Sequence, residues 1–446
     1  MGRVLVIGLD CAPPSLVFDR LERHLPSLTA LRRRGAWAPL RSVAPPITVP
    51  AWACMVSGRD PGELGLYGFR NRASGSYELA IGATTTDTPR VWDVASAAGK
   101  TSCVLYVPLT SPPPAVNGVA VSGFLGEAPP YTHPPELAAD LEARFGPHAP
   151  DVTEFRTDAL DRLLDELYET TRRRFAIGRA LFRERRPDLT MLVEMGTDRL
   201  HHAMWRHLDP THPDHDPNDP RVRDARDYYA FVDAEVGAWL DEAGDDTTVL
   251  VVSDHGARAM RGAVCVNEWL RRNGWLVLRE APAGPARLTP SMVDWSRTRA
   301  FGAGGYYARI FLNVRGREPE GIVEDPEATL AELRDALAAD PILRAEAHRP
   351  AELYRATNGL PPDLLVFFGD LDYRSLGTVG GEVLVREDDR GPDGCNHDWD
   401  GIVIAAGPAI ASRGELARRS IHDVGPTVLR SLGLATPEGW LGSAIE

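Results

Sequence analysis

Residues 44–58 read APPITVPAWACMVSG, and Thr48 lies in this stretch between Pro46 and Pro50. Each proline fixes φ and restricts the residue before it to extended geometry, so we expect Thr48 on a stiff, non-helical loop. Residues 51–57 should form the first turns of a buried helix. A hydroxyl at a helix N-terminus is either a cap or, where free N–H groups and the dipole favour an anion, a nucleophile. This segment alone leaves both interpretations open.

Length and composition indicate a globular protein with room for two domains, or for one large α/β core with insertions. The chain has 446 residues, of which 43% are hydrophobic and 25% are charged. The net charge of −14 argues against a nucleic-acid polymer or an anionic membrane surface as the main partner. The sequence contains no apolar run of transmembrane length, and MGRVLVIGLD reads as a strand rather than a signal peptide.

The cysteines predict a reducing, cytoplasmic setting. They are scattered, odd in number and never in C-x-x-C spacing, so neither a disulfide framework nor a zinc knuckle is expected. They are Cys11, Cys54, Cys103, Cys265 and Cys395.

Chemically capable side chains follow several predicted strands. Asp10 ends the apolar run 4–9, Asp198 follows the run 189–194, and Asp254-His255-Gly256 follows the run 248–253. Ligands of open α/β sheets gather at the carboxyl ends of strands. The plain alternative for Asp10 and Asp198 is a helix N-cap.

Two further histidines belong to the same pattern. His202 comes four residues after Asp198, so the two share one face if a helix starts there. His397 lies in an expected loop, 391–400, directly before the last expected strand, 402–406.

The remaining expected elements come from hydrophobic periodicity and turn residues. Helices are expected at 14–34, 88–99, 158–186, 221–242, 263–274, 326–339 and 423–432, strands at 101–107, 119–122, 306–314 and 364–368, and loops at 59–72, 211–220 and 281–305.

Taken together, these candidates comprise three carboxylates, three imidazoles and one hydroxyl. Such a mixed set suits Zn²⁺ or Mn²⁺, and it is too large for one zinc ion. It divides naturally between two ions about 3.5–4 Å apart, the geometry of metal-assisted phosphoryl chemistry.

These motifs, in this order, resemble the alkaline phosphatase superfamily, and within it the type I phosphodiesterase/nucleotide pyrophosphatase branch. The resemblance runs from Val4 to near the C-terminus and rests on GLD at 8–10, TVPAW at 48–52, SGxxP at 57–61, DxxxH at 198–202, DHG at 254–256, His397 and VGPTVL at 424–429. The insert DWSRTR at 294–299 resembles a subgroup of predicted phosphohydrolases or phosphomutases.

The resemblance implies an α/β fold: an alkaline-phosphatase-like core with a central mostly parallel sheet flanked by helices, plus an inserted cap. We expect the core at residues 1–256 and 391–446, and a cap that sets substrate specificity at 257–390.

The resemblance also implies the site residues and the chemistry. Asp10, Thr48, Asp254 and His255 should hold one divalent ion, and Asp198, His202 and His397 the second, with Zn²⁺ expected and Mn²⁺ as the alternative. Thr48 should be the nucleophile that cleaves a small phosphate ester through a phospho-threonine intermediate. That intermediate is then hydrolysed or passed to an acceptor hydroxyl.

The sequence departs from the branch downstream of the nucleophile. Leu64 and Phe69 stand where nucleotide pyrophosphatases usually carry a His and a phosphate-binding Asn. Arg70, Asn71 and Arg72 are the candidate substitutes if the loop folds back over Thr48, and this leaves diester against monoester preference open. A sulfatase is disfavoured, because Trp52 stands where its signature has Arg.

Three functional hypotheses follow. The first is a two-metal phosphohydrolase that acts on a small phosphodiester or nucleotide-like substrate, and the second is a phosphomutase, phosphotransferase or phosphomonoesterase on the same scaffold. The third, a metal-dead binding protein, is disfavoured because every ligand position carries a competent side chain.

Overall fold

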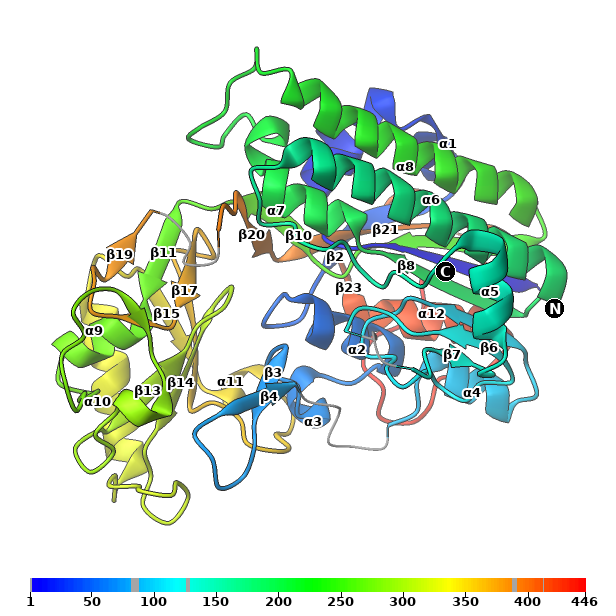
Figure 1. The fold of residues 1–446 in the computed structure, drawn as a ribbon. Coiled ribbons are helices and arrows are strands. Elements are labelled where there is room, and N and C mark those ends of the chain that lie inside the picture. Colours follow the sequence, from blue (N-terminus) through cyan, green and yellow to red (C-terminus); the bar gives the residue numbers. More distant parts are fainter. Residues whose placement is uncertain (1, 82–87, 126–128, 387–390, 412) are drawn as a thin grey trace. The chain divides into compact units, whose positions relative to one another are not determined.

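The computed structural model describes residues 2–81, 88–125, 129–386, 391–411 and 413–446, which form two compact units (Figure 1). Unit 1 contains residues 1–60, 87–257 and 397–446, and unit 2 contains residues 61–86 and 258–396. Residues 61–86, expected in the core, therefore group with unit 2. The expected cap boundary at residue 390 lies outside the described residues.

Unit 1 is built on a ten-stranded sheet. The order is β22 (Gly414–Glu415), β2 (Ala36–Arg41), β21 (Asp400–Ala406), β9 (Thr247–Val252), β1 (Arg3–Leu9), β8 (Leu189–Glu194), β5 (Ser102–Leu105), β6 (Gly118–Val121) and β7 (Thr132–His133), and β23 (Arg419–Ser420) also pairs with β2.

The centre of this sheet is parallel, as the sequence predicted. Strands β9, β1, β8, β5 and β6 run in one direction, while β21 runs antiparallel to β9 and β2 antiparallel to β21. In β1, Val6 pairs with Met191 on one side and with Leu250 on the other. Continuous apolar runs such as VLVIGL form these strands because helices cover both of their faces.

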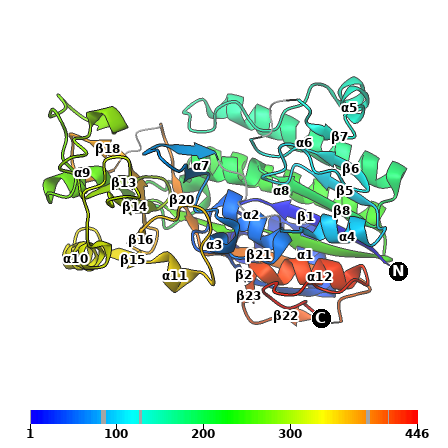
Figure 2. The ribbon, with the colours of Figure 1, turned by 90° about the horizontal axis from the view of Figure 1, so that it is seen from below.

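The helices of unit 1 form two layers. Figure 1 shows one group above the sheet, and Figure 2 shows the other group on the opposite face. The first group is α1 (Pro26–Arg34), α6 (Leu160–Arg185), α7 (Gly196–Leu208) and α8 (Arg221–Ala243), with α5 (Leu137–Phe145) beside α6, and the second is α2 (Thr48–Ser57), α4 (Val91–Ala97) and α12 (Val424–Ser431).

Two sequence-based expectations near the N-terminus are wrong. The single helix expected at 14–34 is instead a π-helical turn (Ser15–Arg20), a 3₁₀ turn (Glu22–His24) and α1. Pro26 has no N–H to continue a helix but suits the first position of a new one. Thr48 is not on a loop but is the first residue of α2. Pro50 is tolerated there because the first N–H groups of a helix have no intrahelical acceptor.

Unit 2 contains a seven-stranded sheet. The order is β13 (Ala300–Ala303), β14 (Ala308–Leu312), β16 (Leu364–Phe368), β17 (Tyr373–Leu376), β11 (Gly262–Cys265) and β19 (Leu384–Val385), and β15 (Ala345–His348) pairs with β16. The helices are α3 (Pro61–Leu64), α9 (Val266–Arg272), α10 (Pro326–Ala339) and α11 (Pro350–Leu353), and small ladders join β3 (Arg70–Arg72) to β4 (Leu79–Ile81) and β12 (Ala286–Arg287) to β18 (Thr378–Val379).

Several expected elements of unit 2 need correction. Residues 263–274 were expected as one helix, but residues 262–265, GAVC, form β11 and pair with β17 before α9 begins. The expected loop at 59–72 contains α3 and β3, and the expected irregular stretch 281–305 contains β12 and β13. The expected loop at 391–400 carries β20 (Cys395–Asp398).

The hairpin β3–β4 packs within unit 2 through an aromatic stack. The Tyr77 and Trp295 rings are 3.5 Å apart at 4° to one another. The Tyr77 hydroxyl donates to Asn313 Oδ1 over 2.9 Å, and Asn313 Nδ2 donates to the carbonyls of Trp295 and Thr298. The DWSRTR motif is therefore part of the packing that holds this hairpin.

For the second segment of unit 2, the chain leaves unit 1 within β10 (Gly256–Ala259) and returns to it within β20. All five cysteines are buried thiols. Within the described part of the chain, we find no helix with the length and apolar character needed to cross a membrane.

Candidate metal centre

Sheet order brings the three predicted aspartates together. Strands β9, β1 and β8 are neighbours and parallel, so their carboxyl ends meet at one edge. Asp254, Asp10 and Asp198 follow these three ends. The three aspartates that follow predicted strands therefore lie together at one edge of the sheet.

The antiparallel strands supply the rest of the set. β21 starts at this same edge, directly after β20, which carries His397. Arg41 at the end of β2 pairs with Asp400 at the start of β21, and the chain then runs to Thr48 at the N-terminus of α2. His202 lies one turn after Asp198 in α7. None of the seven predicted ligands is more than 2% exposed.

The first group of ligands surrounds His255. Its Nε2 lies 3.2 Å from Asp254 Oδ2, 3.7 Å from Asp10 Oδ1 and 3.4 Å from Thr48 Oγ1. Its Nδ1–H donates to the Gly256 carbonyl over 3.0 Å. That hydrogen bond fixes the tautomer and turns the Nε2 lone pair toward the carboxylates, as in metal-bound histidines.

The second group surrounds Asp198. His202 Nε2 and His397 Nε2 each lie 3.5 Å from Asp198 Oδ1 and 3.4 Å from one another. His397 Nδ1–H donates to the Pro46 carbonyl over 3.1 Å, so its Nε2 also presents a lone pair. Two imidazole nitrogens and a buried carboxylate oxygen that converge in this way need a cation, either a proton or a metal ion, among them.

The carboxylates share one further feature. Asp10 Oδ1, Asp198 Oδ1 and Asp254 Oδ2 are buried and accept no hydrogen bond from the described residues. A protein donor holds each opposite oxygen: Trp52 Nε1 on Asp10 at 2.7 Å, Arg199 on Asp198 at 2.6 Å, and the Cys11 N–H on Asp254 at 3.2 Å. Unsatisfied buried oxygens of this kind fit divalent cations.

The titration of the site points the same way. Burial raises the pKa of Asp10, and the negative charge of Asp198 raises it further. Burial also raises the pKa of Asp254, with Asp10 as its charged neighbour. Burial works to raise the pKa of Asp198 too, but the imidazoles of His202 and His397 outweigh it and place that pKa well below its usual range. Metal binding at this site therefore competes with protonation of Asp10 and Asp254.

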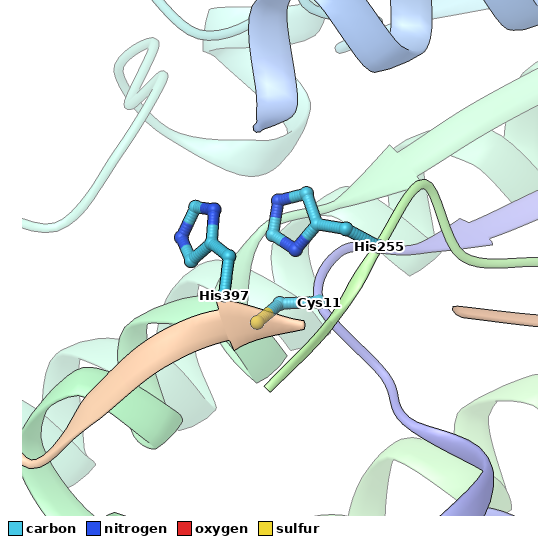
Figure 3. Close-up of side chains that lie close together, drawn as sticks. All are labelled: Cys11, His255 and His397. Carbon is cyan, nitrogen blue, oxygen red and sulfur yellow. The ribbon is translucent and has the colours of Figure 1, made fainter. Parts of the chain in front are cut away.

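A cysteine adjoins the centre. Figure 3 shows Cys11 beside His255 and His397, and potential ligand atoms of the three lie within 4.8 Å of one another. Cys11 has a φ of +64°. Its S–H donates to the Gly256 carbonyl over 3.3 Å, the acceptor that His255 also uses. Cys11 was not among the predicted ligands, although it follows Asp10 directly.

A sequence profile of the type I phosphodiesterase/nucleotide pyrophosphatase family matches residues 4–397. The chain belongs to this family. It is therefore a metal-dependent phosphoric ester hydrolase of the alkaline phosphatase superfamily. No curated protein matches the chain in a sequence search.

Solved structures with the same fold come from animals and a bacterium. Murine ectonucleotide pyrophosphatase/phosphodiesterase 5, as an inactive variant in complex with AMP, has a TM-score of 0.60 at 13% identity and covers 99% of this chain and 97% of its own. Sinorhizobium meliloti phosphonoacetate hydrolase in complex with phosphonoformate has a TM-score of 0.60 at 16% identity over 98% and 96%. The human ectonucleotide enzyme has a TM-score of 0.56 at 14% identity over 99% and 97%.

Several residues that hydrogen-bond to the predicted metal ligands or to their backbone were not predicted from the sequence. Thr197 Oγ1 donates to the Asp10 carbonyl over 2.6 Å, and Ser253 Oγ donates to the His255 carbonyl over 2.7 Å. Trp52 was predicted only as part of the TVPAW motif and as a mark against a sulfatase, and Arg199 had no predicted role. The signal that could have identified Trp52 and Arg199 is their position in the sequence, close to predicted ligands.

The three predicted substrate residues lie in unit 2. Arg72 forms a buried ion pair with Glu318, with NH1 donating over 2.7 Å. The Asn71 side chain accepts from the Tyr67 N–H over 2.8 Å and donates to the Gly68 carbonyl. Arg70 is exposed. These contacts give Arg72 and Asn71 structural roles, and a substrate role for any of the three stays a prediction.

Proposed function

We propose that this family member is a two-metal phosphohydrolase that cleaves a small phosphodiester or nucleotide-like substrate with Thr48 as its nucleophile. One observation carries the proposal: three buried carboxylate oxygens without hydrogen-bond donors converge with three imidazoles beside the Thr48 hydroxyl. This donor set fits divalent ions, because carboxylate oxygens and imidazole nitrogens are the ligands that such ions take in proteins.

The residues divide into two binding sites. Asp10, Asp254, His255 and Thr48 would hold one ion, and Asp198, His202 and His397 the other. Oxygen with imidazole ligands suits Zn²⁺, and Mn²⁺ is the alternative. When bound, such ions neutralise the phosphoryl oxygens and make phosphorus easier to attack.

Thr48 is well placed to react. It is 2% exposed, so bulk water is kept from its hydroxyl, and it is the first residue of α2. The N–H groups of Thr48 and Val49 have no intrahelical acceptor, and they favour phosphoryl oxygens at this helix end.

In the proposed reaction, Thr48 first takes up the phosphoryl group and then releases it to water. Its oxygen forms a bond to phosphorus, the ester P–O bond breaks, and the Thr48 proton ends on the leaving oxygen. Water then attacks the phospho-threonine, phosphate or a phosphomonoester leaves, and Thr48 regains its proton.

The choice of substrate class draws on the similar structures. Their ligands, AMP and phosphonoformate, are both small phosphorus-containing anions. A phosphonate or a phosphomonoester is therefore the second candidate substrate, and transfer to an acceptor hydroxyl is the alternative outcome. Buried thiols at all five cysteines support a reducing, cytoplasmic location.

The test is hydrolysis of p-nitrophenyl thymidine monophosphate, bis-p-nitrophenyl phosphate, p-nitrophenyl phosphate and phosphonoacetate with Zn²⁺ or Mn²⁺. Wild type is compared with Thr48→Ala and with Thr190→Ala, a fully buried threonine of β8 that serves as the matched control. We expect turnover of the diesters that disappears in Thr48→Ala and persists in Thr190→Ala. Equal turnover by Thr48→Ala would exclude the nucleophile, and preference for the last two substrates would reassign the substrate class.

A further inference from the structure

Arg199 binds one of the metal-site carboxylates and is itself held by a second acid. Its NH1 donates to Asp198 Oδ2 over 2.6 Å. Its Nε lies 3.0 Å from both Asp151 oxygens, and its NH2 donates to Asp151 Oδ2 over 2.6 Å. The guanidinium thus lies between two carboxylates, with its fork facing Asp151.

Two aromatic rings fix the plane of this guanidinium. Its central carbon lies 4.4 Å from the Phe155 ring centre and 5.0 Å from that of Phe124. The Arg199 side chain is 6% exposed. Phe155 also contacts His202, with 5.3 Å between the ring centres. Ion pairing and cation–π contacts together leave Arg199 little freedom.

The donor on Asp198 differs in kind from those on the other two aspartates. Asp10 receives a neutral indole N–H from Trp52, and Asp254 receives a backbone N–H. Asp198 receives a full positive charge. A cation beside a metal ligand orients the carboxylate but also repels the incoming ion.

We propose that Asp151 and Arg199 form a positioning pair for the second ion: Arg199 turns Asp198 Oδ1 toward His202 and His397, and Asp151 cancels the charge that Arg199 would otherwise add. The inference rests on the proposed two-metal function. It assigns no contact with substrate to either residue.

This arrangement explains why the acid on the far side of Arg199 matters. With Asp151 present, the set Asp198–Arg199–Asp151 carries one net negative charge, the same as Asp198 alone. Without Asp151, Asp198 and Arg199 together are neutral, and the guanidinium is free to bind both oxygens of Asp198. Loss of Asp151 should therefore harm metal binding more than loss of the whole pair.

The test is metal binding by the full-length protein after chelation, followed by competition titration with Zn²⁺ and by Co²⁺ absorption spectra. The variants are Asp151→Asn, Arg199→Met and the double variant. The matched control is Glu184→Gln, because the exposed Arg144 also bridges two carboxylates, those of Asp140 and Glu184. Glu184 lies at the end of α6, directly before the opposite end of β8.

We expect wild type and the control to bind two ions with equal affinity. Asp151→Asn should weaken one of the two ions by about 10- to 100-fold and change one component of the Co²⁺ spectrum. The double variant should recover part of that loss, because no uncompensated guanidinium remains.

The opposite results overturn the inference. If Asp151 and Arg199 had a purely structural role, the double variant would lose at least the sum of the metal affinities lost in the two single variants. Both ions would then bind more weakly. If a variant does not fold, Asp151→Glu and Arg199→Lys replace it, with near-UV circular dichroism of the metal-free forms as the check. Failure of wild type to bind two ions would instead contradict the proposed function, so the two failures can be told apart.

Discussion

The indole of Trp52 offers a quantitative test of how the protein prepares Asp10 for a metal ion. Trp52→Phe keeps a ring in the core and removes the N–H that donates to Asp10 Oδ2 over 2.7 Å. Trp239→Phe in α8 is the matched control, because Trp239 is also fully buried and its Nε1 has no acceptor among the described residues. The control measures the loss of ring volume alone.

The expected magnitude depends on the charge of Asp10. Burial raises the pKa of Asp10, which favours the neutral carboxyl in the metal-free protein. A hydrogen bond between neutral groups contributes about 0.5–1.5 kcal/mol, and one to a charged acceptor about 1.5–3 kcal/mol. The difference, about 1–1.5 kcal/mol, should appear only when an ion binds, as a roughly 5- to 13-fold weaker affinity.

Two measurements separate these parts. Urea unfolding of the metal-free forms should show that Trp52→Phe costs about 0.5–1.5 kcal/mol more than Trp239→Phe. Competition with a chromophoric chelator should show the additional loss of metal affinity in Trp52→Phe alone. Equal metal affinity in Trp52→Phe, Trp239→Phe and wild type would refute the reasoning.

A second-site change gives an internal check. A Cβ on Gly8 would lie 2.3 Å from Trp52 Cη2, an atom that phenylalanine lacks. Gly8→Ala should therefore be damaging in wild type but should refill part of the space in Trp52→Phe. We expect the double variant Gly8→Ala/Trp52→Phe to be more stable than Trp52→Phe but to bind metal no more tightly.

Three other predictions concern groups around and beyond the centre. Burial lowers the pKa of His201 to about 3, so the folded state holds it neutral and loses stability as the pH falls below the unfolded value of 6.5. Relative to wild type, metal-free His201→Gln should become more stable by up to about 1.4 kcal/mol for each pH unit below 6.5. A difference in unfolding free energy that does not change with pH would contradict this prediction. Arg72→Met should destabilise unit 2 by about 1.5–3 kcal/mol, because buried Glu318 loses one of its two guanidinium partners and keeps only Arg317. Arg72→Met/Glu318→Gln should recover part of that loss, and unchanged unfolding with a higher KM would instead support a substrate role. Asp233 accepts from the first N–H groups of α1, so Asp233→Ala should lower the unfolding free energy by about 1–2 kcal/mol, read by urea titration.

The candidate ligands could be predicted from the sequence because the topology of a parallel sheet brings the ends of its strands together. Asp10, Asp198 and Asp254 each follow an apolar run, and parallel strands place such residues at a common edge. The neighbouring order β9-β1-β8 came from the structure, since no local pattern encodes which strands pair.

The errors have different physical causes. Residues 263–274 begin with AVCV and continue with helix formers, and the pairing of β11 with β17, more than 100 residues away, decided where the helix starts. At Thr48, local proline rules predicted a loop, but the first turn of a helix does not need the N–H groups that proline lacks. Arg199 and Asp151 are distant in sequence, and only folding brings them together.

The composition of unit 2 from two separate segments limits how this protein can be recombined with its relatives. A chimera that exchanges only residues 258–396 would transplant Trp295 and Glu318 while leaving behind Tyr77 and Arg72, the side chains they stack on and pair with. The inherited module is then discontinuous in the gene, so residues 61–86 must be exchanged together with the later segment. Substitutions in one segment should in turn be compensated by changes in the other.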